Sequence, residues 1–240
     1  MNNPLAPSLW KVLQRLNASE EHMKFTLIYD GQLPAGKNKR SLYAAKIRNS
    51  IHPQLRDLWD NHVIMRQLRH EAIVNNHSFV DLATQGKPPS LPDFSGVPPT
   101  LREDQIDLCA PISLDGVGAF WPIVRKELYL ACQIDILMMR HEDPGHLFDA
   151  DGDIDNRLKC FFDALTLPNK EQAQAGENPC SDPLCVLLQD DKLISDFSVR
   201  TARLLGRTEK NQYDVRIQAD VTIKVLRMFG PNQALMGSQG

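Results

Sequence analysis

Four aspartates in two pairs are the residues of this chain best suited to chemistry. Asp153 and Asp155 stand two positions apart in the segment DIDN, and Asp190 and Asp191 are adjacent in QDD. In an extended chain, side chains two positions apart point to the same side, so Asp153 and Asp155 can both reach one cation. Carboxylate oxygens suit hard divalent ions such as Mg²⁺, and a bound ion can activate water for hydrolysis. The spacing predicts a divalent-metal site at Asp153 and Asp155, completed by Asp190 and Asp191 from a neighbouring strand.

Two other interpretations of these acidic residues stay open. Acidic residues in turns are usually solvated, and Asp155 precedes an expected helix, where it can cap free N–H groups. Aspartates also alternate through the segment 149–155, which is typical of calcium loops. An EF-hand needs Gly at its sixth position and Glu at its twelfth, where this chain has Ile154 and Cys160. That excludes the EF-hand but leaves a looser structural calcium site as an alternative.

The elements around the aspartates must bring the two pairs together. Glu127–Met139 is long and mostly apolar, which predicts a buried central strand leading into the acid-rich turn. A helix is expected at Asn156–Leu165, because its apolar residues recur at helical spacing. Cys185–Gln189 predicts a short strand that ends at the second aspartate pair.

The remaining pattern predicts an α+β fold, a mixed β-sheet flanked by helices. We expect a first strand at Lys24–Tyr29 and a long helix from about Gln54 to Asn75. Leu193–Leu205 and Tyr213–Leu226 are expected to form two antiparallel strands joined by the polar turn Gly206–Gln212.

One domain at residues 24–226 accounts for these elements. We expect a helical extension at residues 1–23, an internal insertion at about 66–125, and a flexible tail at residues 227–240.

The composition and net charge of the chain limit the classes of function that it can have. With 42% hydrophobic and 24% charged residues, the 240-residue chain has the composition of a soluble globular protein. A net charge of −3 argues against a surface that binds nucleic acid everywhere, although a local basic stripe is compatible with it. We expect no bilayer-spanning segment and no signal peptide, and the five dispersed cysteines suit a reducing cytoplasm. Cys180 and Cys185 lack a second close pair or a nearby His, so we expect no zinc site there.

The segments DIDNRLK (153–159), FDAL (162–165) and DDKLI (190–194) together resemble the RusA-type Holliday-junction resolvases. LPAGKNKR (33–40) is similar to the N-terminal loop of that family, and the similarity covers roughly Lys24–Arg48 and Glu127–Val225. The resemblance implies a RusA-like fold and a homodimeric endodeoxyribonuclease of DNA recombination and repair that makes paired nicks in branched DNA. Such an enzyme needs Mg²⁺, with Mn²⁺ as an alternative ion, and uses no organic cofactor.

The resemblance also implies roles for individual residues. Asp153, Asp155 and Asp191 are the expected catalytic metal ligands, Asp190 binds metal or orients a ligand, and Lys159 is the catalytic cation. Asp163 matches a family helix position, and as an alternative it forms an i, i+4 pair with Lys159. Activated water would attack phosphorus in line, with Lys159 stabilising the transition state. Expected contacts to DNA phosphates are Lys37, Asn38, Lys39, Arg40, Lys46, Arg48, Arg157 and Lys192.

The main competing hypothesis is a non-catalytic relative that binds nucleic acid or assembles with other proteins through the same fold and metal site. The acidic segment DADG (149–152), directly before Asp153, weakens the attraction of a DNA phosphate to this position, which favours the competing hypothesis. The chain is also long enough to carry substantial additions to a minimal nuclease domain.

Overall fold

The computed structural model describes residues 23–33, 40–75, 101, 103–141, 154–169, 172, 183–205 and 214–236. Its elements, in chain order, are β1 (Lys24–Gln32), α2 (Arg40–Asn61), α3 (Val63–Glu71), β2 (Ile73–Asn75), β3 (Gln105–Asp107), β4 (Ile112–Leu114), β5 (Gly118–Val124), β6 (Leu130–Arg140), α5 (Ile154–Leu165), β7 (Leu184–Leu188), the 3-10 helix η3 (Asp191–Leu193), β8 (Ile194–Arg203), β9 (Asp214–Val225) and the 3-10 helix η4 (Gly230–Met236). This mixture of helices and mixed sheets confirms the expected α+β class.

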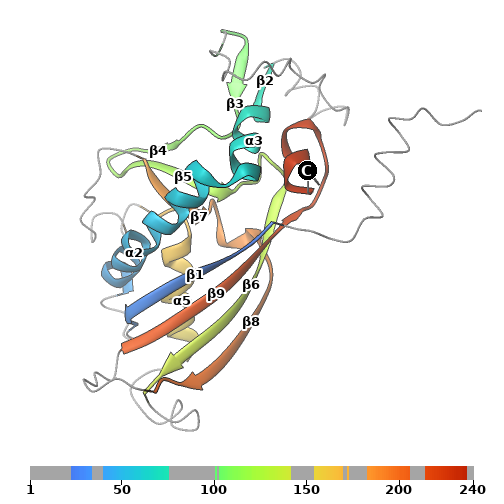
Figure 1. Ribbon diagram of the computed structural model, residues 1–240. Helices are drawn as coiled ribbons and strands as arrows, with labels where there is room; N and C mark the ends of the chain where they lie inside the picture. Colours follow the sequence, from blue (N-terminus) through green and yellow to red (C-terminus); the bar gives the residue numbers. More distant parts are fainter. Residues whose placement is uncertain are drawn as a thin grey trace, which may run out of the picture.

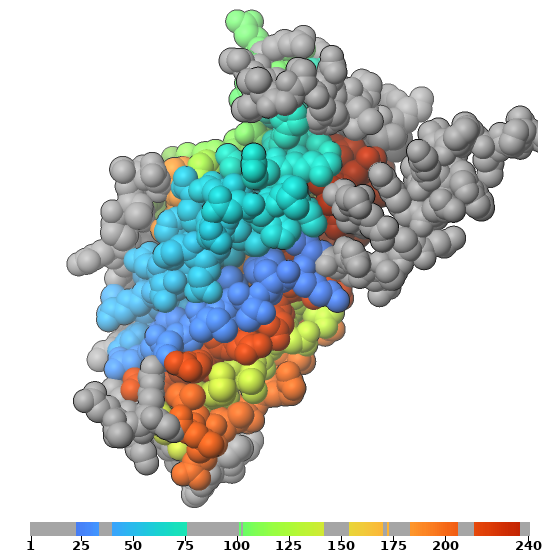
Figure 2. Space-filling view, viewed as in Figure 1, coloured from blue at the N-terminus to red at the C-terminus, as the bar shows by residue number. Residues whose placement is uncertain are grey.

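A four-stranded sheet in the order β1-β9-β6-β8 forms the largest layer (Figure 1). The strand β9 runs antiparallel to β1 and β6, whereas β8 runs parallel to β6. Buried and half-buried residues alternate along β6, so one face of the sheet lies in the core. The other face carries polar side chains of β9 and, in β6, Gln133 and Asp135 followed by the half-buried Leu137 and Met139. Figure 2 shows the four strands side by side on this face with no helix in front of them.

The helices α2 and α5 pack against each other; in Figure 1, α5 lies behind the sheet and α2 lies alongside the edge strand β1. In α2, the buried residues Ala44, Ile47, Ile51 and Leu55 follow the helical repeat and make one apolar stripe. They share one core cluster with the buried residues of β6, β9 and α5. This core fixes the position of α5, which carries part of the predicted site.

The expected strands at the start of the chain, at its centre and before Asp190 are confirmed as β1, β6 and β7. The expected pairing of the last two strands is wrong. They run in opposite directions, but β6 lies between them and hydrogen-bonds to both. The helix expected at Gln54–Asn75 is also revised, because α2 and α3 break at His62 and Ile73–Asn75 form a strand.

The end of the described chain is packed, contrary to the expectation of a flexible tail from residue 227. Phe229, Ala234 and Leu235 are buried, and η4 packs on α3. The buried Asn232 amide donates hydrogen bonds to the carbonyls of Leu128 and Arg227, which satisfies it inside the core. The expected N-terminal helix at residues 1–23 lies outside the described residues apart from Met23. Within the described chain, no helix combines the length and apolarity that a membrane span requires.

Candidate functional site

The helix α5 presents an apolar face to the core and a polar face to solvent. Its buried residues include Cys160, Phe161, Ala164 and Leu165, spaced by three and four positions. Asp155 stands in the first turn, where a carboxylate interacts favourably with the positive end of the helix dipole. Packing of the apolar face against the core therefore fixes the orientation of α5, and this keeps its polar face toward solvent.

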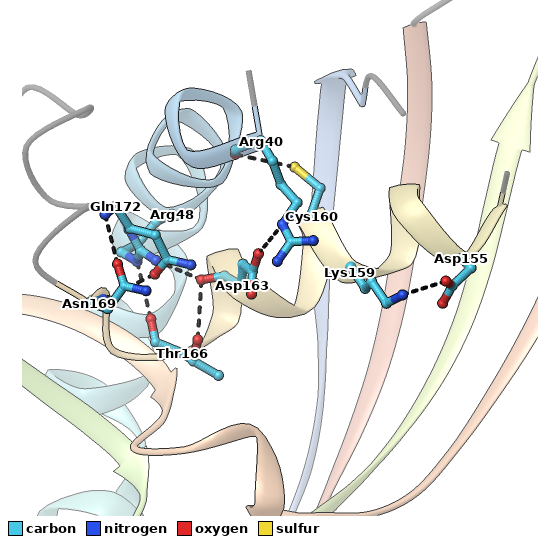
Figure 3. Close-up of polar contacts among 9 residues, drawn as sticks. All are labelled: Arg40, Arg48, Asp155, Lys159, Cys160, Asp163, Thr166, Asn169 and Gln172. Atoms are coloured by element: carbon cyan, nitrogen blue, oxygen red, sulfur yellow. Dashed lines mark hydrogen bonds and ion pairs between the residues drawn. The ribbon is translucent and has the colours of Figure 1, made fainter. Parts of the chain in front are cut away.

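Asp155 and Lys159 form an ion pair on the exposed face of α5, with 2.5 Å between Lys159 Nζ and Asp155 Oδ2 (Figure 3). Their side chains are 57% and 52% exposed. An exposed pair at i, i+4 contributes only about 0.3–0.5 kcal/mol to stability. The fold therefore depends little on this pair, which presents a carboxylate and an ammonium group to any ligand. Asp153 lies outside the described residues.

The other end of α5 is held by two arginines of α2 (Figure 3). Arg48 donates hydrogen bonds to the carbonyls of Asp163, at 2.6 Å, and Thr166, at 3.2 Å. Arg40 Nε lies 2.7 Å from the Asp163 carboxylate. Burial lowers the pKa of Arg48 to about 10, and the charge of Asp163 partly opposes that shift. Arg48 thus binds carbonyls at the negative end of the helix and stays charged at neutral pH.

These contacts correct part of the predicted DNA interface. Arg48 is only 4% exposed and Arg157 only 1%, and Arg157 donates a hydrogen bond to the carbonyl of Leu33. The prediction that these two arginines contact phosphate is wrong, because both guanidinium groups lie inside the fold. The alternative that Asp163 pairs with Lys159 is not what the structure has, since Asp163 pairs with Arg40.

The remaining basic candidates have separate positions. Lys46 is exposed on α2 with its Nζ 5.1 Å from the centroid of the Tyr43 ring, and Lys192 is exposed in η3. Arg40 is partly exposed but already paired. The other expected phosphate contacts, Lys37, Asn38 and Lys39, lie outside the described residues.

Asp190 and Asp191 lie in the exposed turn that begins η3. Asp190 Oδ1 accepts a hydrogen bond of 3.0 Å from the backbone N–H of Lys192, which caps this short helix. That bond holds the pKa of Asp190 below its usual value. A hydrogen bond with Asp190, together with partial desolvation, raises the pKa of Asp191.

Asp155 and the Asp190–Asp191 pair lie toward opposite ends of α5. Thr166, just after α5, bridges to Leu188, two residues before Asp190. From Asp155 to Thr166 the helix advances about 16 Å, at 1.5 Å per residue. The Phe162 ring of α5 also contacts Phe197 of β8, with 5.3 Å between the ring centroids. Asp191 stands just before the first residue of β8, and the direction from Phe197 back to Asp191 leads away from Asp155.

Consequently Asp155 shares no cluster with Asp190 and Asp191. Across the described ranges, no group of three or more His, Cys, Asp or Glu side chains could hold a metal ion. The geometry does not support the expectation that Asp190 and Asp191 complete the site at Asp155.

The sequence interpretation also missed a polar row across the open face of the sheet. Asp135 of β6 lies directly opposite Asp220 of β9. Ser198 donates a hydrogen bond of 2.5 Å to Asp135, and Thr26 donates one of 2.6 Å to Asp220. Alternation of polar and apolar residues in each strand is the signal for this face, but only the strand register reveals that the two carboxylates meet.

Comparison of the chain with models of protein families, with curated proteins and with solved structures gives no match. Any functional assignment therefore depends on the residues and geometry described above.

Proposed function

We propose that this protein is a metal-dependent endonuclease that hydrolyses phosphodiester bonds in branched DNA, with its metal held by Asp153 and Asp155. The observation that carries the proposal is the exposed Asp155–Lys159 pair at the start of α5, directly after the chain segment that contains Asp153. The resemblance of the motif DIDNRLK to the RusA-type resolvases supports the same assignment.

The donor set fits a hard cation. The carboxylate of Asp155 is 57% exposed, and carboxylate oxygens are the ligands that Mg²⁺ and Mn²⁺ prefer. Bound magnesium would supply water activation and neutralise charge on a phosphate.

The position of Lys159 supports the proposal that it acts as the catalytic cation. Its ammonium group is within 2.5 Å of Asp155 Oδ2, so a phosphate beside Asp155 also lies beside a positive charge. A fixed cation next to the phosphate stabilises the extra negative charge of a phosphoryl-transfer transition state. The core packing of Phe161 and the contacts of Arg48 to the last carbonyls keep α5, and therefore this pair, in place.

The position of Asp190 and Asp191 favours a second candidate, a non-catalytic nucleic-acid-binding or assembly protein with the same fold. Because Asp190 and Asp191 lie away from Asp155, the proposed metal has fewer carboxylate ligands than the sequence predicts. A site with fewer ligands binds Mg²⁺ more weakly.

Cleavage of synthetic four-way, flap and linear DNA in Mg²⁺ separates the two candidates. We expect the wild type to cut branched DNA and the Asp153→Asn and Asp155→Asn variants to lose at least about a hundredfold in rate. Asp57→Asn, at an exposed aspartate of α2, is the matched control and should cut normally. DNA binding without metal-dependent cutting would support the second candidate, and neither binding nor cutting would contradict both.

A further inference from the structure

The outer edge of β8 has no strand beside it among the described residues. The sheet order ends at β8, which hydrogen-bonds to β6 on one side only. At ten residues, β8 is a long edge strand, and Phe197 in its middle is 52% exposed. Figures 1 and 2 show β8 along one border of the sheet. A long exposed edge with an apolar side chain is a template for pairing with another strand.

The backbone groups that point outward follow from the pairing with β6. Leu204 N–H donates to the carbonyl of Arg140, so Leu204 faces β6. Along a parallel pair, alternate residues face the neighbouring strand, and the register has no shift after Asp196. Phe197, Val199 and Thr201 therefore direct their N–H and C=O groups away from β6, where a new strand can bind them.

The sequence of β8 is complementary to itself in the antiparallel direction. When two copies are placed about a two-fold axis at Ser198, Asp196 lies opposite Arg200 of the other copy and Phe197 lies opposite Val199. Shifting the axis by one residue, to Val199, places Asp196 opposite Ala202 and removes both charge pairs. Opposite charges and apolar pairs directly across two strands are the contacts that stabilise a sheet.

The backbone pattern agrees with this register. The outward-facing Phe197 and Val199 would form the hydrogen-bonded pairs. Asp196 and Arg200 would then occupy the non-hydrogen-bonded pairs, in which opposite side chains are closest. Both charged side chains are exposed in the single chain and so are available to a partner.

We propose that β8 pairs antiparallel with β8 of a second copy of this chain, about a two-fold axis at Ser198, joining the two sheets into one. Two Asp196–Arg200 pairs and two Phe197–Val199 pairs hold the interface. The proposal is independent of the endonuclease assignment, because it concerns the mass and register of an assembly and not cleavage.

Sedimentation of the full chain tests the charge pairs. We expect a species of twice 27.1 kDa for the wild type. Asp196→Arg and Arg200→Asp each replace two attractions with two repulsions, which should weaken the dimer about tenfold or more. Mixing the two variants restores opposite charges across the interface, so a heterodimer should form. Lys24→Asp, a charge reversal on the opposite edge strand β1, should leave the dimer unchanged.

A single introduced cysteine tests the register. Ser198→Cys places two thiols across the two-fold axis within disulfide range, so oxidation should link the copies. Arg200→Cys places its two thiols about four residues apart along the strands, or roughly 13 Å, and should not link them beyond the level of the unmodified chain. A wild type that stays monomeric, reversals that leave its mass unchanged, an unrestored mixture, or equal cross-linking of both cysteine variants would overturn the proposal.

Discussion

The two ends of α5 use similar residue types in different ways. At the first turns, Asp155 and Lys159 pair within the helix and remain more than half exposed. At the last turn, Asp163 pairs with Arg40 of α2, and the buried Arg48 binds the helix carbonyls. One end can therefore change its partners at little cost in stability, whereas the other end is fixed by the rest of the fold.

This difference shows why charge alone does not identify a binding residue. Arg48 and Arg157 look like surface cations in the sequence, but both lie in the core and donate to backbone carbonyls. Burial converts a potential phosphate ligand into a structural group, because an anion in solvent cannot reach a guanidinium group inside the fold.

Replacing Arg48 should produce the largest change. Arg48→Ala leaves the carbonyls of Asp163 and Thr166 without their donor inside the fold and removes a buried side chain. We expect the free energy of unfolding to fall by about 3 kcal/mol, as measured in urea. The matched control is Lys46→Ala on the exposed face of the same helix, which should stay within about 0.5 kcal/mol of the wild type. Equal losses in the free energy of unfolding for Arg48→Ala and Lys46→Ala would contradict the claim that Arg48 fixes the last turn of α5.

Replacing Lys159 should affect activity and not stability. Lys159→Met removes the positive charge beside Asp155, and we expect the rate of branched-DNA cleavage in Mg²⁺ to fall about a hundredfold, or about 2.7 kcal/mol. The free energy of unfolding should change by less than about 0.5 kcal/mol, because the pair is exposed. A large loss of stability with a normal specific cleavage rate would reverse the roles given to the two ends.

Arg40 should show an intermediate stability effect. Its pair with Asp163 is only partly buried, so Arg40→Ala is expected to cost about 0.5–1 kcal/mol in thermal or urea unfolding. A cost as large as that of Arg48→Ala would show that charge pairing, and not satisfaction of the buried carbonyls, fixes this end of α5.

The smallest effect concerns the acidic turn beside η3. The pKa of Asp190 should lie below the usual value of 3.8 and that of Asp191 above it, as measured by carboxyl-carbon NMR. The lowered pKa gives stability that is lost as the pH falls through it, and the raised pKa gives stability that is lost as the pH rises through it. The first contribution acts below the usual value of 3.8 and the second above it, so we expect the free energy of unfolding to rise slightly up to about pH 3.8 and to fall slightly above it. Two unshifted titrations would contradict the hydrogen bond between the carboxyl groups.

Local sequence patterns predicted the main elements well. The long apolar run became β6, and apolar residues at helical spacing became α5, because burial of one face determines both structures. The pairing of the last two strands was wrong, since nothing in either strand's own sequence says that β6 inserts between them. The position of Asp191 relative to Asp155 likewise depends on chain direction across the sheet and not on spacing in the sequence.

Binding of Mn²⁺ without DNA, followed by the EPR signal of the free ion, tests the central claim most directly. The claim is that the metal belongs to the exposed end of α5. We predict that Asp155→Asn weakens Mn²⁺ binding by more than about tenfold, whereas Asp191→Asn leaves it within about twofold of the wild type. Equal losses in the two variants, or a loss in Asp191→Asn alone, would contradict the claim.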